Sequence, residues 1–563
     1  MKKVLPTLVI LILLGVLGTM FYKEYWVKYS YSSEMADVNE YYGVKAEDDY
    51  PVVLQDQLSE YHAKKIGDHY YLDLAMAKAQ INDRFYYGEE DGKLCYCLPD
   101  TRITAEEGSD IWTDSSGAEN KEEYKICVKD GDTLYVAMDF LKKYSNFSYE
   151  PFTGPNHVRI YTEWGEQQVA QVTKDTNLRV TGGVKSAVVT EVPSGSRVII
   201  LDKMETWCKV ETEQAMIGYI ENRKMTEAET VLMTPVKDYK EPEYKRTSLG
   251  TKVNMVWHNI AGAAGNVTLG GRIDRTKSVN VVSPTWLAVL NEGGSVEVRA
   301  TQDYVDAVHD RGMQVWAVLD NFTGPDGVQQ KFLASDDSRT AVIEKAMDTV
   351  TSMGIEGINV DFEGITEQYG ESYIEFIREL SIECRREGIV LSVDNYVPYN
   401  FNNHYRIDEQ GLFADYVVIM GYDEHYAGSQ EPGSVASIDY VTYGIEEALR
   451  SVPANKLING IPFYTRIWKT TAQGVSSEAY GMDQIQTFIA NHGMTVDWNA
   501  SACQNYAEVS EDDATYQIWV EDAESIDKKL EVMHSHNIAG VAEWCLGMES
   551  SDVWDVISQY MKR

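Results

Sequence analysis

Basic residues are scarce in this 563-residue chain, which has 50 lysines and arginines against 88 aspartates and glutamates. The formal net charge is therefore -38. Nucleic acids and anionic membrane surfaces attract proteins through a surplus of positive charge. The composition thus argues against nucleic acid as a partner, and it is typical of the solubilising surface of an acidic secreted protein.

Cysteine is also sparse, with seven residues scattered along the chain. No C-x-x-C pair or histidine cluster has the spacing of a zinc site, so we expect neither a metal nor another cofactor. An odd, scattered set does not support a disulfide framework, and buried thiols are the expected state. One alternative stays open, in which Cys95 and Cys97 pair with Cys127.

Only one hydrophobic run is long enough to matter for a membrane, from Val4 to Tyr22 behind a basic tip. Its length is about that of a bilayer span. An aromatic stretch with Tyr25 and Trp26 follows it in place of a small-residue cleavage site. We therefore predict an uncleaved signal anchor over residues 1–28, with a cleaved signal peptide as the alternative. The expected location is the cell membrane, single-pass, with the catalytic part extracellular.

At this length the chain needs several domains, because one hydrophobic core does not grow that large. Composition changes mark their boundaries. After the anchor we predict a polar stalk at 29–65, a small α+β module at 66–164, a small β-barrel at 168–228, a linker rich in Lys, Glu and Pro at 229–250, and a catalytic barrel at 251–563.

Residues 357–363, Gly-Ile-Asn-Val-Asp-Phe-Glu, alternate apolar and polar side chains, which predicts a β-strand with two different faces. Asn359, Asp361 and Glu363 share one face because successive strand residues point in opposite directions. Buried carboxylates are costly unless they are hydrogen-bonded or used. A charged Asp361 beside Glu363 would raise the pKa of the glutamate, as a general acid at neutral pH requires.

Apolar runs recur on both sides of this strand and alternate with helical patterns, which predicts a (β/α)8 TIM barrel of parallel strands. The surplus length lies between Trp468 and Trp519 and predicts an inserted small α+β unit. The expected strands are Val253–His258, Val279–Val282, Gln314–Leu319, Gly357–Phe362, Val390–Val393, Tyr416–Met420, Leu457–Ile461 and Gly540–Glu543. The expected helices are Thr301–Arg311, Ser338–Met353, Tyr369–Glu387 and Ser437–Ser451.

The stretch Glu356 to Glu363 resembles the D-G-x-D-x-D-x-E signature of family 18 glycoside hydrolases, the family of chitinases and endo-N-acetylglucosaminidases. Glu356 and Asn359 stand where the signature has its first two aspartates, and the asparagine resembles the branch of spore cortex-lytic and other cell-wall enzymes. The resemblance implies that Glu363 is the acid and later the base, and that Asp361 holds the substrate acetamide. Since Asn359 cannot take up charge, we expect a pH profile unlike that of chitinases.

Further site residues follow from the same resemblance. Met420-Gly421-Tyr422-Asp423 resembles the M-x-Y-D motif, which implies that Tyr422 binds the acetamide and that Asp423 contacts the sugar. Trp544 matches the tryptophan that forms the floor under the cleaved sugar. Other candidates lie at predicted strand ends, as expected for the active rim of such a barrel: Trp286, Asp320 with Asn321, Asp394, Tyr396 and Arg466.

Two upstream segments resemble known modules. Residues 66–164 are similar in layout to the small N-terminal domain of copper amine oxidases, common on Gram-positive surfaces, but they have no His or Cys set to hold copper. Residues 168–228, with Asn177–Val180 and Trp207–Val210, resemble the bacterial SH3-like repeat, which implies cell-wall binding; a spacer role is the alternative.

These expectations combine into one hypothesis: a cell-envelope hydrolase of β-1,4-linked N-acetylglucosamine glycans, with peptidoglycan as the first choice of substrate. Chitin or host N-glycans are alternatives with the same chemistry. A glycan-binding wall protein on a degenerate barrel is an alternative of another class, but it would have lost the acid, and Glu363 is present.

Overall fold

The computed structural model describes residues 4–234, 239–323 and 330–563. These residues form two compact units. The first contains residues 1–85, 105–112 and 119–241, and the second contains residues 86–104, 113–118 and 242–563. Two short segments upstream of the barrel therefore belong to the same unit as the barrel.

The first unit begins with an apolar helix, α1 (Val4–Phe21), which continues through a π-helical turn (Tyr22–Trp26) into α2 (Val27–Tyr29). Residues 7–29 have the length and hydropathy of a membrane span, and none of them is buried in the protein. A signal sequence near an N-terminus has the same properties. The predicted apolar segment is present as a helix. This helix fits an uncleaved membrane anchor and a cleaved signal peptide equally well.

A seven-stranded sheet with the order β11-β12-β1-β2-β3-β10-β9 follows in the first unit. Its strands are β1 (Asp49–Leu54), β2 (Gln57–Ile66), β3 (His69–Asp73), β9 (Cys127–Asp130), β10 (Thr133–Ala137), β11 (Ser148–Phe152) and β12 (His157–Tyr161). Helices α4 (Leu74–Gln80) and α5 (Met138–Tyr144) pack on β3 and β10. Strands β7 (Ile111–Thr113) and β8 (Glu119–Lys121) lie between β6 and β9 in the chain.

The segment expected to be a stalk is folded. It contains α3 (Val38–Tyr42), all of β1 and most of β2. Tyr42 and Tyr50 are buried, and the Tyr42 hydroxyl donates to the Ala215 carbonyl at 2.9 Å. These two tyrosines are core residues of a stretch that was expected to be a polar stalk, and a buried tyrosine usually finds a partner for its hydroxyl.

A second seven-stranded sheet, β15-β14-β18-β17-β16-β13-β19, forms the small β-rich domain. Its strands are β13 (Glu166–Gln171), β14 (Thr176–Arg179), β15 (Val188–Val192), β16 (Arg197–Lys203), β17 (Trp207–Thr212), β18 (Ile217–Glu221) and β19 (Glu229–Leu232). Its core includes Leu178, Val198, Val210 and Ile220. Strand β19 lies at the start of the expected linker, and residues 235–238 of that linker are outside the described residues.

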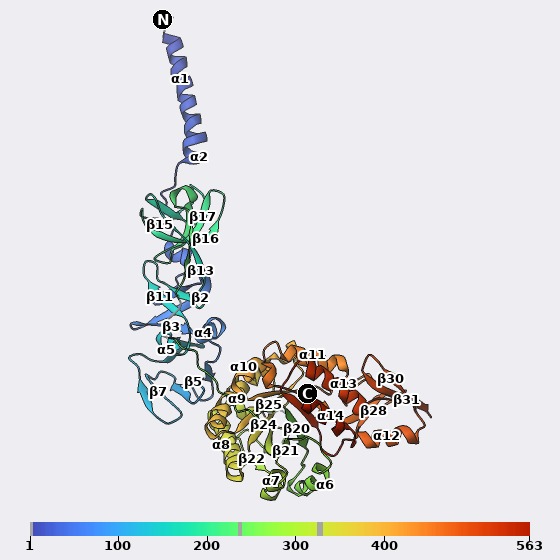
Figure 1. The fold of residues 1–563 in the computed structure, drawn as a ribbon. Coiled ribbons are helices and arrows are strands. Elements are labelled where there is room, and N and C mark those ends of the chain that lie inside the picture. Colours follow the sequence, from blue (N-terminus) through green and yellow to red (C-terminus); the bar gives the residue numbers. More distant parts are fainter. Residues whose placement is uncertain (1–3, 235–238, 324–329) are drawn as a thin grey trace. The chain divides into compact units, whose positions relative to one another are not determined.

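The second unit is built on a closed barrel of eight parallel strands (Figure 1). Around the barrel the order is β20-β33-β27-β26-β25-β24-β23-β21, and β20 pairs with β21 to close it. The strands are β20 (Val253–His258), β21 (Val281–Val289), β23 (Gln314–Asp320), β24 (Gly357–Asp361), β25 (Val390–Tyr396), β26 (Tyr416–Met420), β27 (Leu457–Pro462) and β33 (Gly540–Trp544). The short β22 (Val296–Val298) pairs antiparallel with β21.

Helices follow the strands and cover the outside of the barrel (Figure 1). They are α6 (Leu269–Ile273), α7 (Gln302–His309), α8 (Asp336–Met353), α9 (Glu367–Glu387), α10 (Ile407–Phe413), α11 (Ile438–Ala448), α13 (Ala523–Ser535) and α14 (Val553–Lys562). Helices α8 and α9 end at Gly354 and Gly388, whose φ angles of 69° and 71° favour glycine and stop the helix. The predicted (β/α)8 barrel is confirmed.

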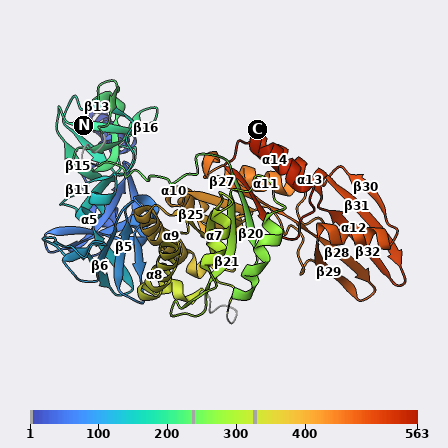
Figure 2. The same ribbon diagram turned by 60° about the horizontal axis from the view of Figure 1, so that its bottom comes forward.

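The inserted unit is a five-stranded sheet, β29-β28-β32-β31-β30, with one helix (Figure 2). Its elements are β28 (Tyr464–Thr471), β29 (Gly474–Gly481), α12 (Met482–Asn491), β30 (Thr495–Asn499), β31 (Gln504–Glu511) and β32 (Ala514–Val520). It has a small core of its own that includes Ile485, Ala507 and Ile518. The predicted α+β insertion is confirmed.

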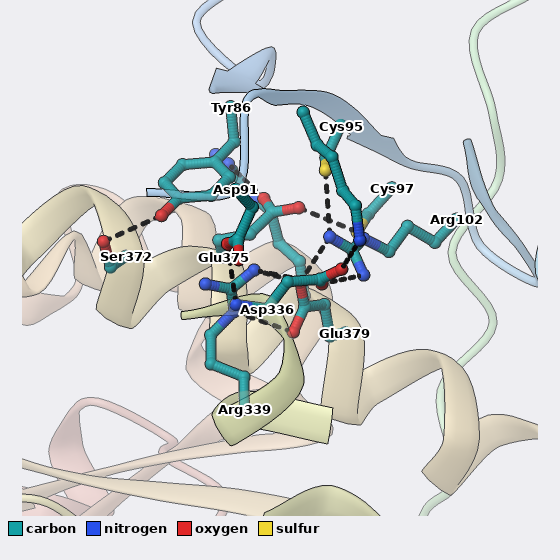
Figure 3. A network of polar contacts seen from close by, with 12 residues as sticks. Tyr86, Asp91, Cys95, Cys97, Arg102, Asp336, Arg339, Ser372, Glu375 and Glu379 are labelled. Carbon is teal, nitrogen blue, oxygen red and sulfur yellow. Dashed lines mark hydrogen bonds and ion pairs between the residues drawn. The ribbon is translucent and has the colours of Figure 1, made fainter. Parts of the chain in front are cut away.

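An additional antiparallel pair, β4 (Tyr86–Gly88) and β5 (Lys93–Cys97), packs on α9 outside the barrel. The Tyr86 hydroxyl lies 2.9 Å from the Ser372 hydroxyl, and Arg102, the first residue of β6 (Arg102–Glu106), reaches Asp336 at 2.6 Å (Figure 3). All seven cysteines are free thiols, and every one except the partly exposed Cys503 is buried.

Candidate active site

Strand β24 carries the candidate site at the mouth of the barrel. Asn359 and Asp361 are buried, and Glu363 follows the strand end and is partly exposed. A β-strand directs every second side chain to the same face. Carboxyl ends of barrel strands form the face where such barrels bind and convert substrates. The predicted row of polar residues is therefore located where a substrate can reach its outer member.

Asn359 is held by hydrogen bonds on both sides of its amide. Its Oδ1 accepts from the Trp257 indole at 2.9 Å and lies 3.3 Å from the Ser283 hydroxyl. Its Nδ2 donates to the Ser392 hydroxyl at 2.9 Å and to Asp394 Oδ1 at 2.8 Å. The amide orientation is fixed, because the indole can only donate and must face the carbonyl oxygen.

Glu363 is oriented through its main chain and its side chain. Asn321 forms two hydrogen bonds with the Glu363 backbone, each of 2.9 Å. The Tyr396 hydroxyl donates to Glu363 Oε2 at 2.7 Å. Tyr396 is 37% exposed, so the pair faces the open side of the barrel.

The pKa values of the two acids are raised from their ordinary values. For Glu363 burial is the main cause; the Tyr396 hydrogen bond opposes it and the nearby Asp423 adds to it. For Asp361 burial is again first, followed by repulsion from Asp394, Glu363 and Asp320. A raised glutamate pKa keeps a proton available for donation near neutral pH.

Tyr422 and Asp423 follow strand β26. Tyr422 is buried, and burial followed by the charge of Asp361 raises its pKa. Asp423 is exposed, has a positive φ of 59° and accepts a 2.5 Å hydrogen bond from the Tyr464 hydroxyl. A left-handed conformation at a residue other than glycine is held only by its surroundings, and such residues gather at functional sites.

Trp544 ends strand β33 and is partly exposed. Its ring lies 5.9 Å from the ring of Trp257, which in turn lies 6.5 Å from the Tyr422 ring. The three aromatic residues therefore come together, Trp257 from β20, Trp544 from β33 and Tyr422 from the segment after β26. The sequence analysis placed Tyr422 and Trp544 in the site but treated Trp257 only as part of an apolar strand.

Two other candidates lie near the site. Asp320 pairs with Asp361 across β23 and β24 and is buried, and burial raises its pKa to about 6. Arg466 is partly buried in β28 of the insertion and donates to the Ser477 hydroxyl at 3.2 Å. Its positive charge lowers the pKa of Tyr464, the partner of Asp423, although burial leaves that pKa raised.

Trp286 is not at the site. It is completely buried, its indole donates to Asn266 at 2.8 Å, and its ring lies 4.8 Å from the Tyr304 ring. The pairing of β21 with β23 shifts between Thr285 and Leu287, and such a bulge changes which face the next residue takes. A sugar cannot reach this ring, so the structure does not support the expected substrate contact.

Asp394 is deeper than expected. The sequence analysis placed it at the rim, just past the end of a predicted strand, but β25 continues to Tyr396 and Asp394 is only 2% exposed. Its position beside Asn359 could have been inferred only from the register of neighbouring strands, which a single sequence does not provide.

Comparison with known proteins identifies two domains. Residues 288–549 match the model of glycosyl hydrolases family 18, and residues 174–225 match the bacterial SH3 domain. The uncharacterized glycosylase YvbX of Bacillus subtilis is 25% identical over 262 residues, which cover 44% of this chain and 76% of the relative. The cortical fragment-lytic enzyme of Bacillus subtilis is 25% identical over 261 residues, which cover 44% of this chain and 59% of that protein.

Among solved structures, the chitinase of Chromobacterium violaceum superimposes with a TM-score of 0.50 and 22% identity, covering 56% of this chain and 100% of that chain. A likeness at this identity shows the fold. The barrel of this chain thus contains a segment that matches family 18 glycosyl hydrolases, a segment upstream of it matches the bacterial SH3 domain, and the chain is by class a glycoside hydrolase.

Proposed function

We propose that this chain cleaves β-1,4-linked N-acetylglucosamine glycans, with peptidoglycan as the substrate, by substrate-assisted catalysis with retention of configuration. The observation that carries the proposal is the pair of acids at the end of one strand, Asp361 as the last residue of β24 and Glu363 two residues later. Most glycosidases place two carboxylates on opposite sides of the scissile bond. Asp361 and Glu363 lie two residues apart on one side, so the nucleophile has to come from the substrate.

In the first step, Glu363 gives its proton to the glycosidic oxygen as the bond from that oxygen to the anomeric carbon breaks. The carbonyl oxygen of the 2-acetamido group attacks the anomeric carbon and forms a cyclic oxazolinium ion. Asp361 accepts a hydrogen bond from the acetamide N–H and stabilises the positive charge that develops on that nitrogen. The Tyr422 hydroxyl donates a hydrogen bond to the acetamide, and Trp544 packs under the sugar ring.

In the second step, a water molecule enters from the side of the departed sugar. Glu363, now a carboxylate, takes a proton from this water as its oxygen bonds to the anomeric carbon and the oxazolinium ring opens. Two displacements at one carbon restore its original configuration. Asp423 and Tyr464 lie beside the site and contact the sugar, and Arg466 supports Tyr464.

Two observations support a wall glycan. The cortical fragment-lytic relative points to a spore-wall polymer, and the bacterial SH3 domain is typical of wall-binding proteins. We infer that the SH3 domain holds the chain on the wall and that helix α1 anchors it in the membrane of a Gram-positive type envelope. The resemblance of residues 66–164 to the copper amine oxidase module stays a prediction.

Chitin oligomers are the second candidate substrate, because one relative, 24% identical over 241 residues, is the probable chitinase 2 of Drosophila melanogaster. The test incubates the full chain in mild detergent with purified wall sacculi and, separately, with chitin oligomers. Mass spectrometry then identifies the new reducing-end sugar. N-acetylglucosamine ends from sacculi are expected; muramic acid ends would contradict the proposed bond, and cleavage of chitin alone would favour the second candidate.

A further inference from the structure

Three aspartates lie side by side across three neighbouring strands at the mouth of the barrel. Asp320 on β23 pairs directly with Asp361 on β24. Val360 on β24 pairs with Val393 on β25, so the next residues, Asp361 and Asp394, are also neighbours. Adjacent strands are about 4.8 Å apart, and paired residues of a parallel sheet point to the same face.

Asp361 and Asp394 each have one carboxylate oxygen without a hydrogen-bond partner among the described residues. Asp361 Oδ1 and Asp394 Oδ2 are buried and make no hydrogen bond within the described part of the chain. The two residues are 5% and 2% exposed. Two buried carboxylates at this separation cannot both be ionised at acceptable cost, and one proton between them relieves the repulsion.

Asn359 holds one oxygen of Asp394 and leaves the other free to share a proton with Asp361. The Trp257 indole fixes the Asn359 amide so that its Nδ2 faces Asp394 Oδ1 at 2.8 Å. The other oxygen of Asp394 is left for a second partner. Asp320 is satisfied differently, because its Oδ1 accepts from the Phe322 N–H at 3.2 Å.

We propose that Asp394 shares a proton with Asp361. Asn359 cannot do so, because an amide does not take up charge. The inference rests on the proposed function. While the site is empty, one proton is shared between Asp361 Oδ1 and Asp394 Oδ2. When the acetamide nitrogen becomes positive, the proton stays on Asp394 and the full negative charge is on Asp361. Asp394 is thus a positioning residue, since it acts through Asp361 and does not touch the sugar.

Other ionisable groups face this pair from the surrounding elements. They are Asp320 of β23, Glu363 after β24, Tyr422 of β26, Tyr373 of α9 and Tyr405 before α10. The three tyrosine hydroxyls have raised pKa values, mainly because they are buried, so they remain neutral in the range where the carboxylates titrate. The acid limb of the pH profile is therefore set by the carboxylates.

Two variants of Asp394 should shift this acid limb in opposite directions. In the parent, protonated Asp394 donates to ionised Asp361 and favours its charged form. Asp394→Ala removes this donor and leaves Asp361 as a single buried carboxyl, so the limb moves to higher pH. In Asp394→Asn the amide oxygen keeps the bond from Asn359, and the amide N–H₂ donates to Asp361. This donor never ionises and so never repels Asp361, and the limb moves to lower pH.

Both variants should also lose rate, because Asp361 can no longer exchange its proton; about 10²-fold in kcat is expected for a lost proton-transfer partner. Adding Asn359→Asp to Asp394→Ala supplies a carboxylate on the other side of Asp361 and should recover at least part of the rate and return the limb toward its original pH. The measurement is kcat and kcat/KM against pH on a soluble N-acetylglucosamine oligomer and on peptidoglycan fragments, with the full chain.

The matched control is Asp415→Asn, a buried aspartate before β26 that accepts from the Thr247 and Leu391 N–H groups at 2.7 and 2.9 Å. It should lower thermal stability and leave the acid limb in place. If the Asp394 variants leave the limb in place as well, the proton-sharing role is wrong. Glu363→Gln in the same assay separates the two claims: cleavage that survives this change overturns the proposed function itself.

Discussion

Two groups of carboxylates in the second unit have different surroundings. The barrel-mouth carboxylates, Asp320, Asp361, Glu363 and Asp394, repel one another, and their pKa values are raised by burial. The α8/α9 ion cluster, on the outside of the barrel, places Asp336 and Glu379 among the cationic groups of Lys93, Arg102 and Arg339 (Figure 3).

The acids of the α8/α9 ion cluster are paired with cations. Arg339 makes two 3.0 Å bonds to the two oxygens of Glu379, and Lys93 donates to Asp336 at 2.8 Å. Burial raises the pKa of Asp336, but Arg102 and Lys93 more than compensate and lower it to about 2. Burial alone therefore does not identify a functional carboxylate. The cationic partners of Asp336 lower its pKa, whereas burial and neighbouring carboxylates raise the pKa of Asp361.

The largest effect is expected at the barrel mouth. Glu363→Gln removes the proton donor while preserving shape, and kcat should fall by about 10³-fold or more. Initial rates of reducing-end release measure it. Glu367→Gln, an exposed change in the first turn of α9, is the matched control and should leave the rate unchanged. If Glu363→Gln cleaves the glycan at the parent rate, Glu363 is not the proton donor.

Breaking the α8/α9 ion cluster should act on stability and leave the chemistry intact. Arg339→Met leaves Glu379 buried without its bidentate partner, and a loss of about 3–5 kcal/mol in unfolding free energy is expected. Denaturant titration followed by intrinsic tryptophan fluorescence measures it. The kcat of the folded fraction should stay at the parent value. A loss of kcat with unchanged stability would show that the α8/α9 ion cluster serves catalysis and not the stability of the fold.

Asp361→Asn tests the opposite case. Because no cation is paired with Asp361 and its carboxylate neighbours repel it, the amide should leave the unfolding free energy unchanged or increase it. Activity should fall by about 10²-fold, since the stabilising charge beside the acetamide nitrogen is lost. Paired melting curves and rate measurements decide the matter, and a large loss of stability would show that Asp361 is structural.

Asp320 and Asp336, one aspartate from each group, should also respond to pH with opposite sign. Asp320 has a folded pKa raised to about 6, so its contribution to stability is present below the unfolded value and is lost as pH rises through about 6. Asp336 has a folded pKa lowered to about 2, so its contribution is present above the unfolded value and is lost as pH falls through about 2. Unfolding free energies of Asp320→Asn and Asp336→Asn against pH check both directions, and equal slopes would contradict them.

The smallest effect is expected on an exposed aromatic surface. Phe401 is 79% exposed and stacks on Tyr399 with ring centroids 5.5 Å apart, and Tyr399 stacks on Tyr443 at 5.0 Å. Aromatic faces bind the apolar faces of sugar rings. Phe401→Ala should raise KM severalfold on a glycan polymer and leave kcat unchanged; the same KM on polymer and on a short oligomer would exclude this surface from binding.

Much of the barrel could be predicted because its signals are local. The alternation in residues 357–363 and the buried apolar strands follow from side-chain periodicity, and seven of the eight predicted strands begin where the structure places them. Glu363, Asp361 and Tyr396 meet at the mouth because strand ends converge there.

The misplaced residues depended on non-local geometry. Trp286 faces the helices because β21 has a pairing shift at Thr285, and Asp394 is buried because β25 is three residues longer than its apolar run. Lys93 of β5 and Arg102 of β6 form ion pairs with Asp336 of α8, more than 200 positions away in the chain. No periodicity in the sequence specifies such partners.

The central claim is that the sugar's own acetamide, positioned by Asp361, is the nucleophile. The most direct measurement is proton NMR of the first product released from an N-acetylglucosamine oligomer, recorded before the anomers equilibrate. The account predicts the β-anomer, formed by two displacements at one carbon. An α-anomer as the first product would show a single displacement by water and would contradict it.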